Sequence, residues 1–283
     1  MSVQELPLHD IEELPLRDVP GPTALGGGWR RSLDLLYLMS VTEFKQTYFG
    51  TVLGYLWSLC RPLMLFGVLL VVFTHLLRFS TVAHYPVLLL MNIVLFGFFS
   101  EATNQAVPSI VANEGIVRKT QFPRLVIPLS IVLTSLFNLS LNMIVVFAFM
   151  LGFGITPMWT WLLLPVLVAM LTVFTTAVAM IVSSLYPRYR DMAIIWSVVS
   201  TVLFYATPVL YPLQKLSGPL QTVVAMNPLT PILELARRWL IDPTAPLTGG
   251  TLRIAVPVFL YVTVVAAAVL IFRREAPRIA EAL

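Results

Sequence analysis

Few side chains in this sequence are both ionisable and placed where they could act in transport or catalysis, and Glu101 is the first of them. It is the only carboxylate within the long apolar segments, and Asn104 and Gln105 follow it by about one helical turn. An ionisable group in an apolar segment of membrane-spanning length is expensive, so it commonly lines a polar path or an ion site. The alternative is a structural carboxylate that pairs with a basic group or with water.

Motifs for catalysis are absent from the sequence. There is no GxxxxGK[ST] phosphate-binding loop, no HExxH zinc motif and no Cys/His cluster. His9, His75 and His84 are far apart, and the single cysteine, Cys60, excludes an intramolecular disulfide. We therefore expect no catalytic residue, no metal site and no cofactor held by this chain itself.

Two short basic segments are suited to contacting another protein. The segment 113–124 combines charges and an apolar stripe with a Phe-Pro stop, which predicts a short docking helix, and the segment 186–191 is a tighter turn. Alternatively, both are only the positive anchors that flank membrane spans. The candidate docking residues are Glu114, Val117, Arg118, Lys119, Phe122, Arg124, Tyr189, Arg190 and Asp191.

A long uncharged run places these segments in a membrane protein. No Asp, Glu, Lys or Arg occurs from Leu125 to Pro187, whereas one charge at mid-bilayer costs about 2.5–3.5 kcal/mol on insertion scales. A span needs about 20 residues, so the run divides into two at Gly152, Gly154 and Pro157. The chain is 58% hydrophobic and 11% charged, against about 25% charged in soluble domains.

The same reasoning along the chain predicts an all-α integral membrane protein. An amphipathic helix over residues 30–57 lies in the membrane interface or, alternatively, packs on protein. Within the apolar spans, Asn138 and Asn142 are spaced to hydrogen-bond between helices. The six expected transmembrane helices cover residues 61–75, 85–111, 125–151, 159–185, 192–210 and 254–272.

Two further regions complete the predicted organisation. Residues 1–28 carry five acids against one basic residue and read as a flexible acidic tail, ahead of a single membrane domain over 29–283. Between the last two spans, residues 217–226 and 230–241 predict two short helices, with Thr230 as an N-cap before Pro231. They form either a re-entrant pair buried in protein or a surface hairpin.

The distribution of positive charge predicts the orientation. Most Lys and Arg residues after the tail fall on the side of the two termini, which by the positive-inside rule is the cytoplasmic side. The net charge of +4 is small and spread along the chain, so it indicates membrane topology and not nucleic-acid binding.

Five short motifs, in order, give the sequence a family resemblance that covers nearly everything after residue 30. It resembles the permease subunit of ABC exporters for lipid-linked polysaccharides, of the O-antigen, teichoic-acid and galactan type. The motifs are YFGTVLGYLW at 48–57 followed by Arg61-Pro62-Leu63; Asn113, Val117–Lys119, Phe122–Arg124 and Pro128; Tyr189–Asp191; Pro208–Tyr211; and Asn227-Pro228.

The resemblance implies a homodimer in the cytoplasmic membrane that binds two copies of a separate ABC ATPase. ATP and Mg²⁺ would act through that ATPase, and the two docking segments would couple it to export of a polyprenyl-linked glycan. The lipid headgroup would meet the cations Arg30, Arg31, Lys45 and Arg61. A sliding glycan would stack on aromatic faces, so the expected path residues are Phe96, Phe98, Phe99, Glu101, Trp196, Phe204, Tyr205 and Tyr211.

Three other functions compete with this interpretation. A related permease would export a small hydrophobic compound or drug. A self-contained transporter would need several intramembrane acids, and a lipid-modifying enzyme would need clustered Asp, His or Glu at one interface. The sequence offers only Glu101 for either of these roles.

Overall fold

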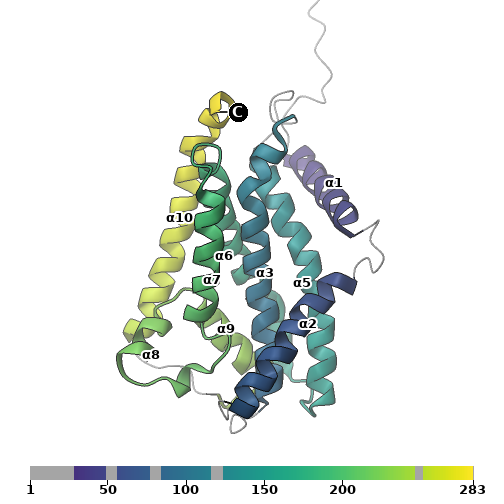
Figure 1. Cartoon of the computed structure of the whole chain (residues 1–283), viewed down its shortest axis with the longest axis vertical. Coiled ribbons are helices and arrows are strands. Elements are labelled where there is room, and N and C mark those ends of the chain that lie inside the picture. The colour runs from purple at the N-terminus through teal and green to yellow at the C-terminus, as the bar shows by residue number, and fades with distance from the viewer. Residues whose placement is uncertain (1–28, 49–55, 77–83, 116–123, 246–250, 283) are drawn as a thin grey trace, which may run out of the picture.

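The structure is a computed structural model that describes residues 29–48, 56–76, 84–115, 124–245 and 251–282. Every regular element in these ranges is a helix and none is a strand, which confirms the all-α prediction. The long helices run side by side in a bundle, and the C-terminal helix ends at one end of it (Figure 1). The predicted acidic tail, residues 1–28, lies outside the described residues.

Within the described ranges, five helical segments are long and apolar enough to cross a membrane, which indicates a multi-pass membrane protein. They are Leu56–Thr74, Tyr85–Ala112, Val126–Gly152, Trp159–Leu185 and Arg253–Glu275. These segments correspond to α2 (Leu56–Val71) with a π-helical turn (Val72–Leu76), α3 (Tyr85–Ala112), α5 (Val126–Gly152), a 3₁₀ turn (Trp159–Leu163) with α6 (Leu164–Leu185), and α10 (Thr251–Ala282).

The fifth expected span is shorter than its apolar sequence. Helix α7 covers Met192–Ala206, 15 residues, which is less than the about 20 that a perpendicular span needs. The helix stops because Thr207 precedes a proline, which disfavours helical geometry, and Thr207 is indeed extended at φ −99° and ψ 147°. The count of six spans stays a prediction.

The break in the uncharged run lies where the sequence predicted it. Helix α5 ends at Gly152, and Gly154 adopts a left-handed conformation at φ 78°. The amide of Ile155 then donates to the carbonyl of Met150 at 2.9 Å, a pattern that closes many helix C-termini.

Helix α3 forms the centre of the bundle. It packs against α2, α5, α6 and α7, and 78% of its apolar window is buried, compared with 6% for α2 and 11% for α10. A helix that is apolar all round belongs in an interior. The faces that α2 and α10 expose are left for lipid or for another chain.

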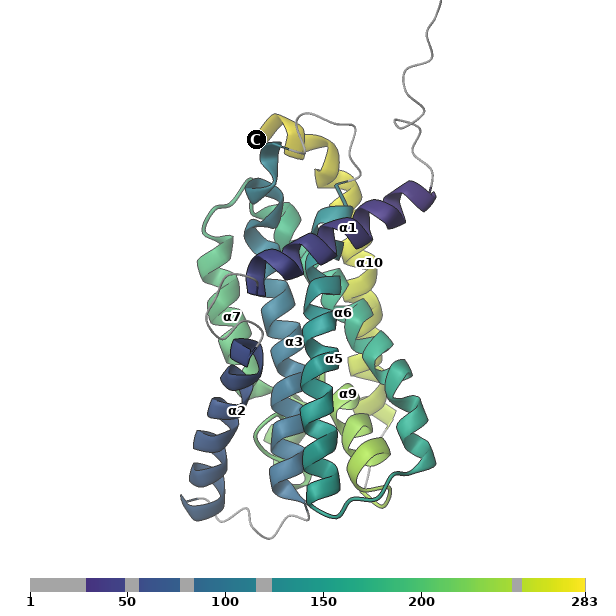
Figure 2. The same cartoon turned by 90° about the vertical axis from the view of Figure 1, so that its right-hand side faces the viewer.

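The amphipathic helix α1 covers Trp29–Tyr48 of the predicted range 30–57, and residues 49–55 lie outside the described part. It crosses α5 near the end of the bundle that carries the C-terminus (Figure 2). Ser40 is fully buried, its hydroxyl donates to the carbonyl of Ser130 at 3.2 Å, and Thr134 donates to the carbonyl of Ser40 at 3.2 Å. Thus α1 packs on protein, and its place in the membrane interface stays a prediction.

The two short helices form at the opposite end of the bundle from the C-terminus (Figure 1). They are α8 (Gly218–Ala225) and α9 (Thr230–Ala236), and a π-helical turn (Arg237–Ile241) continues α9. The predicted N-cap is wrong: Leu229 holds that position, and the Thr230 hydroxyl donates to the carbonyl of Val224 at 2.7 Å. Re-entry of this pair into the membrane stays a prediction.

Candidate functional site

The carboxylate of Glu101 joins α3 to α5. Its Oε1 accepts hydrogen bonds from Asn138 Nδ2 on α5 at 3.1 Å and from Gln105 Nε2 at 3.3 Å. Asn138 thus bonds between helices as predicted, whereas Asn142 donates to the carbonyl of Asn138 within α5. This arrangement supports the structural interpretation of Glu101.

A second polar contact ties α3 to α7. The hydroxyls of Ser100 and Ser200 lie 2.9 Å apart, and Asn104 Nδ2 reaches the Ser200 hydroxyl at 3.3 Å and the Ser100 carbonyl at 2.7 Å. Ser200 is buried. Sequence reasoning missed Ser200, because a serine within an apolar helix carries no signal of the partner that it meets in space.

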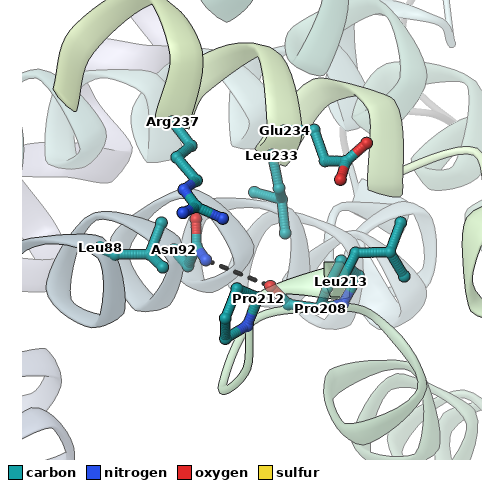
Figure 3. Close-up of a pocket in the computed structure, with 8 residues that line it drawn as sticks. All are labelled: Leu88, Asn92, Pro208, Pro212, Leu213, Leu233, Glu234 and Arg237. Atoms are coloured by element: carbon teal, nitrogen blue, oxygen red, sulfur yellow. Dashed lines mark hydrogen bonds between the residues drawn. The ribbon is translucent and has the colours of Figure 1, made fainter. Parts of the chain in front are cut away.

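The third contact fixes the chain beyond α7, at the end away from the C-terminus. Asn92 Nδ2 donates to the carbonyl of Pro208 (Figure 3) and to that of Val209, both at 3.2 Å, and the Tyr85 hydroxyl donates to the carbonyl of Leu210 at 2.8 Å. The buried carbonyls of this irregular segment have no helical partner and need donors from elsewhere. Two buried side chains of α3 supply them, so α3 positions the Pro208–Tyr211 motif.

The Asn227-Pro228 motif stabilises the same region. Asn227 Nδ2 donates to the Thr207 hydroxyl at 2.8 Å, and its Oδ1 accepts from the backbone amide of Leu229 at 3.0 Å. One side chain thereby links the start of α9 to the end of α7. The cavity drawn in Figure 3 holds only about 10 Å³, which is room for about one water molecule.

Most of the predicted aromatic path residues lie together between α3 and α7. The ring of Phe96 is 5.3 Å from that of Phe204, and the ring of Phe99 is 6.3 Å from that of Trp196. Phe96, Phe98 and Phe99 are buried in the core of the chain, whereas Tyr205 is 61% exposed. Tyr211 lies in the loop after α7, where its hydroxyl donates to the carbonyl of Tyr205 at 2.9 Å.

Sequence reasoning also missed a polar stripe on the outer face of α7. Ser197, Thr201 and Tyr205 are exposed and follow one another at intervals of four residues, which places them on one helix face. The Ser197 hydroxyl donates to the carbonyl of Ile194 at 2.8 Å, and that of Thr201 to the carbonyl of Ser197 at 2.9 Å. The i, i+4 spacing was the signal that could have identified this stripe.

The cations proposed for a lipid headgroup are placed separately. Lys45 lies in the last turn of α1 and Arg61 in the second turn of α2, and both are exposed. Arg30 and Arg31 lie in the first turn of α1, and their side chains are outside the described part of the structure.

The C-terminal end of α3, the N-terminal end of α5 and the turn between α6 and α7 lie at the end of the bundle that carries the C-terminus (Figure 1). Glu114 follows α3, Arg124 precedes α5, and Val117, Arg118, Lys119 and Phe122 lie outside the described residues. In the second segment the amide of Tyr189 donates to the carbonyl of Leu185 at 2.9 Å, and the amide of Met192 donates to that of Tyr189 at 3.0 Å. This turn therefore joins α6 to α7 directly.

Comparison with known proteins gives a consistent family. The family model described as "ABC-2 type transporter" matches residues 34–240. The O-antigen export system permease protein RfbA of Klebsiella pneumoniae is 29% identical over 201 residues, which cover 71% of this chain and 77% of that protein. RfbA of Myxococcus xanthus is also 29% identical, over 70% and 77%. The polysialic acid transport protein KpsM of Escherichia coli is 24% identical over 212 residues, 73% and 80%.

Proposed function

The chain belongs to the ABC-2 type transporter family, and from this premise we propose that it is the transmembrane subunit of an ATP-driven polysaccharide exporter. The observation that carries the proposal is the likeness, over more than two thirds of the chain, to relatives named for O-antigen export and for polysialic acid transport. These relatives share a polymer of sugars as cargo. The proposal therefore names polysaccharide as the cargo class, without specifying its sugars.

The proposed assembly contains two copies of this chain and two copies of a separate ATPase. The sequence has no phosphate-binding loop, so ATP and Mg²⁺ would act in the partner. A second copy suits the exposed faces of α2 and α7, which include Met64, Val68 and Val71 on α2 and Ile195, Val198 and Val202 on α7. The polar stripe of α7 would then border a passage between the two copies.

The proposed coupling runs through the turn at 186–191. The ATPase would contact the residues of both docking segments, which are Tyr189, Arg190 and Asp191 in the turn and Glu114, Val117, Arg118, Lys119, Phe122 and Arg124 in the first segment. Because the turn leads straight into α7, closure of the ATPase pair would displace that helix. The hydrogen bonds of Ser200 would carry the displacement to α3.

The proposed substrate is a glycan on a polyprenyl phosphate or diphosphate carrier. The exposed cations Lys45 and Arg61, with Arg30 and Arg31, would meet the phosphate. The exposed ring of Tyr205 and the hydroxyls of Ser197 and Thr201 would contact the sugars. The wall of the passage behind them would be formed by the other predicted path residues, which are Glu101, Phe96, Phe99, Trp196, Phe204 and Tyr211. In this proposal the protein lies in the cytoplasmic membrane, with six spans over 29–283 and both termini inside.

Purification from native membranes tests the proposal. The full-length tagged chain, solubilised in a mild detergent, should co-purify with an ABC ATPase in stoichiometric amount. Deletion of the gene for this chain should leave lipid-linked glycan inside the cell. Repeated purification without an ATPase would contradict the exporter assignment. An ATPase without glycan accumulation would favour export of a small hydrophobic compound.

A further inference from the structure

The turn between α6 and α7 holds each of its two arginines against a tyrosine ring. The guanidinium carbon of Arg190 lies 5.3 Å from the ring centroid of Tyr186, and that of Arg188 lies 5.4 Å from the ring centroid of Tyr189. Both distances are within the about 6 Å at which a cation is attracted by an aromatic face. The arginine side chains therefore have preferred positions although they are exposed.

The two rings differ in how firmly they are held. Tyr189 is 53% exposed, whereas Tyr186 is half-buried and packs against the main apolar core. The amide of Tyr186 donates to the carbonyl of Val182 at 3.2 Å, so the residue continues the hydrogen bonding of α6. Tyr186 is thus held in place by the core, and the guanidinium group of Arg190 lies over its ring.

The remaining charge of the turn is also directed outward. Asp191 occupies the N-cap position of α7, yet its side chain makes no capping hydrogen bond and the residue is exposed. Asp is among the residues that most often cap a helix through their side chain. The turn consequently presents two guanidinium groups and one carboxylate, a surface with a net positive charge.

We propose that Tyr186 is a positioning residue that holds Arg190 ready for a carboxylate on the docking surface of the ATPase. This inference rests on the proposed function and adds the chemistry of the contact. A guanidinium binds a carboxylate through two parallel hydrogen bonds, so its orientation matters as well as its charge. A side chain that is already oriented loses less freedom on binding, which strengthens the complex.

The test is the affinity of the ATPase for the full-length permease reconstituted in lipid nanodiscs. Tyr186→Phe keeps the aromatic face and should bind like the wild type. Tyr186→Leu keeps apolar contact with the core and loses the face, so the dissociation constant should rise about two- to five-fold, the range for an exposed cation–π contact. In an Arg190→Ala background, Tyr186→Leu should cause no further loss.

Ionic strength tests the chemistry of the partner. Wild-type binding should weaken as salt is raised, and Arg190→Ala should weaken less steeply, because exposed charge pairs are screened. Equal salt dependence of the wild type and of Arg190→Ala would contradict the proposal that Arg190 binds a carboxylate of the ATPase. An equal loss from Tyr186→Leu in both backgrounds, or no loss in either, would overturn the positioning role. If the wild-type chain bound no ATPase, the proposed function itself would fall.

Discussion

Glu101 is bound at one oxygen by two amides, and this geometry decides what its substitutions should do. Glu101→Ala removes an acceptor from the buried amide of Asn138, and loss of a buried partner costs about 1–3 kcal/mol. Glu101→Gln keeps the size of the side chain and an acceptor oxygen. We therefore expect Glu101→Ala to lower the free energy of unfolding in detergent by that amount, with Glu101→Gln near wild type.

Export separates the two interpretations of this carboxylate. With a structural role, Glu101→Gln should support glycan export at the wild-type rate when expression is matched. Lost export by a stably folded Glu101→Gln protein would show that the charge itself acts on the transport path.

Asp242, outside the membrane-spanning helices, should contribute to the pH dependence of stability. Its Oδ1 accepts from the Thr244 hydroxyl at 2.6 Å and from the Thr244 amide at 3.0 Å, and these bonds, with the positive charges of Arg237 and His84, lower the pKa of the carboxyl group against the opposing effect of burial. The folded pKa is therefore below the unfolded value of about 3.9. The stabilisation is complete above that pH and is lost as the pH falls through the folded pKa.

Melting curves at several pH values check this sign. Asp242→Asn should reduce the fall in Tm that accompanies acidification from about pH 5 to below pH 4, the range set by the unfolded pKa. Equal falls for Asp242→Asn and the wild type would contradict the prediction.

At the scale of elements, α7 depends on α3 for its polar contacts. Ser200 bonds to Ser100 and Asn104 of α3, whereas Ser197, three residues earlier, bonds only within its own helix among the described contacts. Ser200→Ala should therefore loosen α7, by about 0.6 kcal/mol for an average interhelical bond in a membrane, and Ser197→Ala should not. Hydrogen exchange of residues 192–206 in lipid should be faster in the first variant, and equal exchange in the two would contradict the prediction.

Helix positions followed from the sequence more readily than helix partners did. The break after Gly152 was predictable because glycine and proline act on their own neighbours, and the short helices around Pro219 and Pro231 were predictable for the same reason. The predicted helix over 192–210 was too long. The sequence remains apolar past Ala206, but the helix ends there. The central place of α3 was hidden, since a helix that is apolar all round shows no preferred face.

In the candidate site, too, local features were predictable from the sequence and contacts between distant residues were not. The charged turn at 186–191 could be predicted, because its residues are adjacent in the sequence. The contact of Arg190 with Tyr186 needs the turn of the backbone, and the contacts of Asn92 and Ser200 join residues about 100 positions apart. Local pattern carries no information on such distant pairs. The aromatic path residues were grouped by residue type alone, and which of them are buried depends on the packing of α7 on α3.

At the scale of the whole molecule, the exposed faces of α7 and α10 differ in chemistry. The face of α7 carries Ser197, Thr201 and Tyr205 among its apolar side chains, whereas α10 exposes Val258, Val262 and other large apolar residues. Lipid favours the second kind of face, and polar side chains in membrane helices tend to face a water-filled cavity or the bundle interior. We therefore expect water at the stripe of α7 and lipid at α10.

Thiol labelling distinguishes these two environments in the assembled protein. The chain has one cysteine, Cys60, so Cys60→Ser gives a background without thiols, to which Thr201→Cys or Val262→Cys is added. A thiolate forms only where water is present, so a charged, membrane-impermeant maleimide should modify Thr201→Cys at least tenfold faster than the matched Val262→Cys. Lipid-linked glycan added during the reaction should slow the labelling of Thr201→Cys, because a polymer in the passage would cover it. Equal and slow labelling at both positions would place the α7 stripe in lipid and would move the transport path to another face of the bundle.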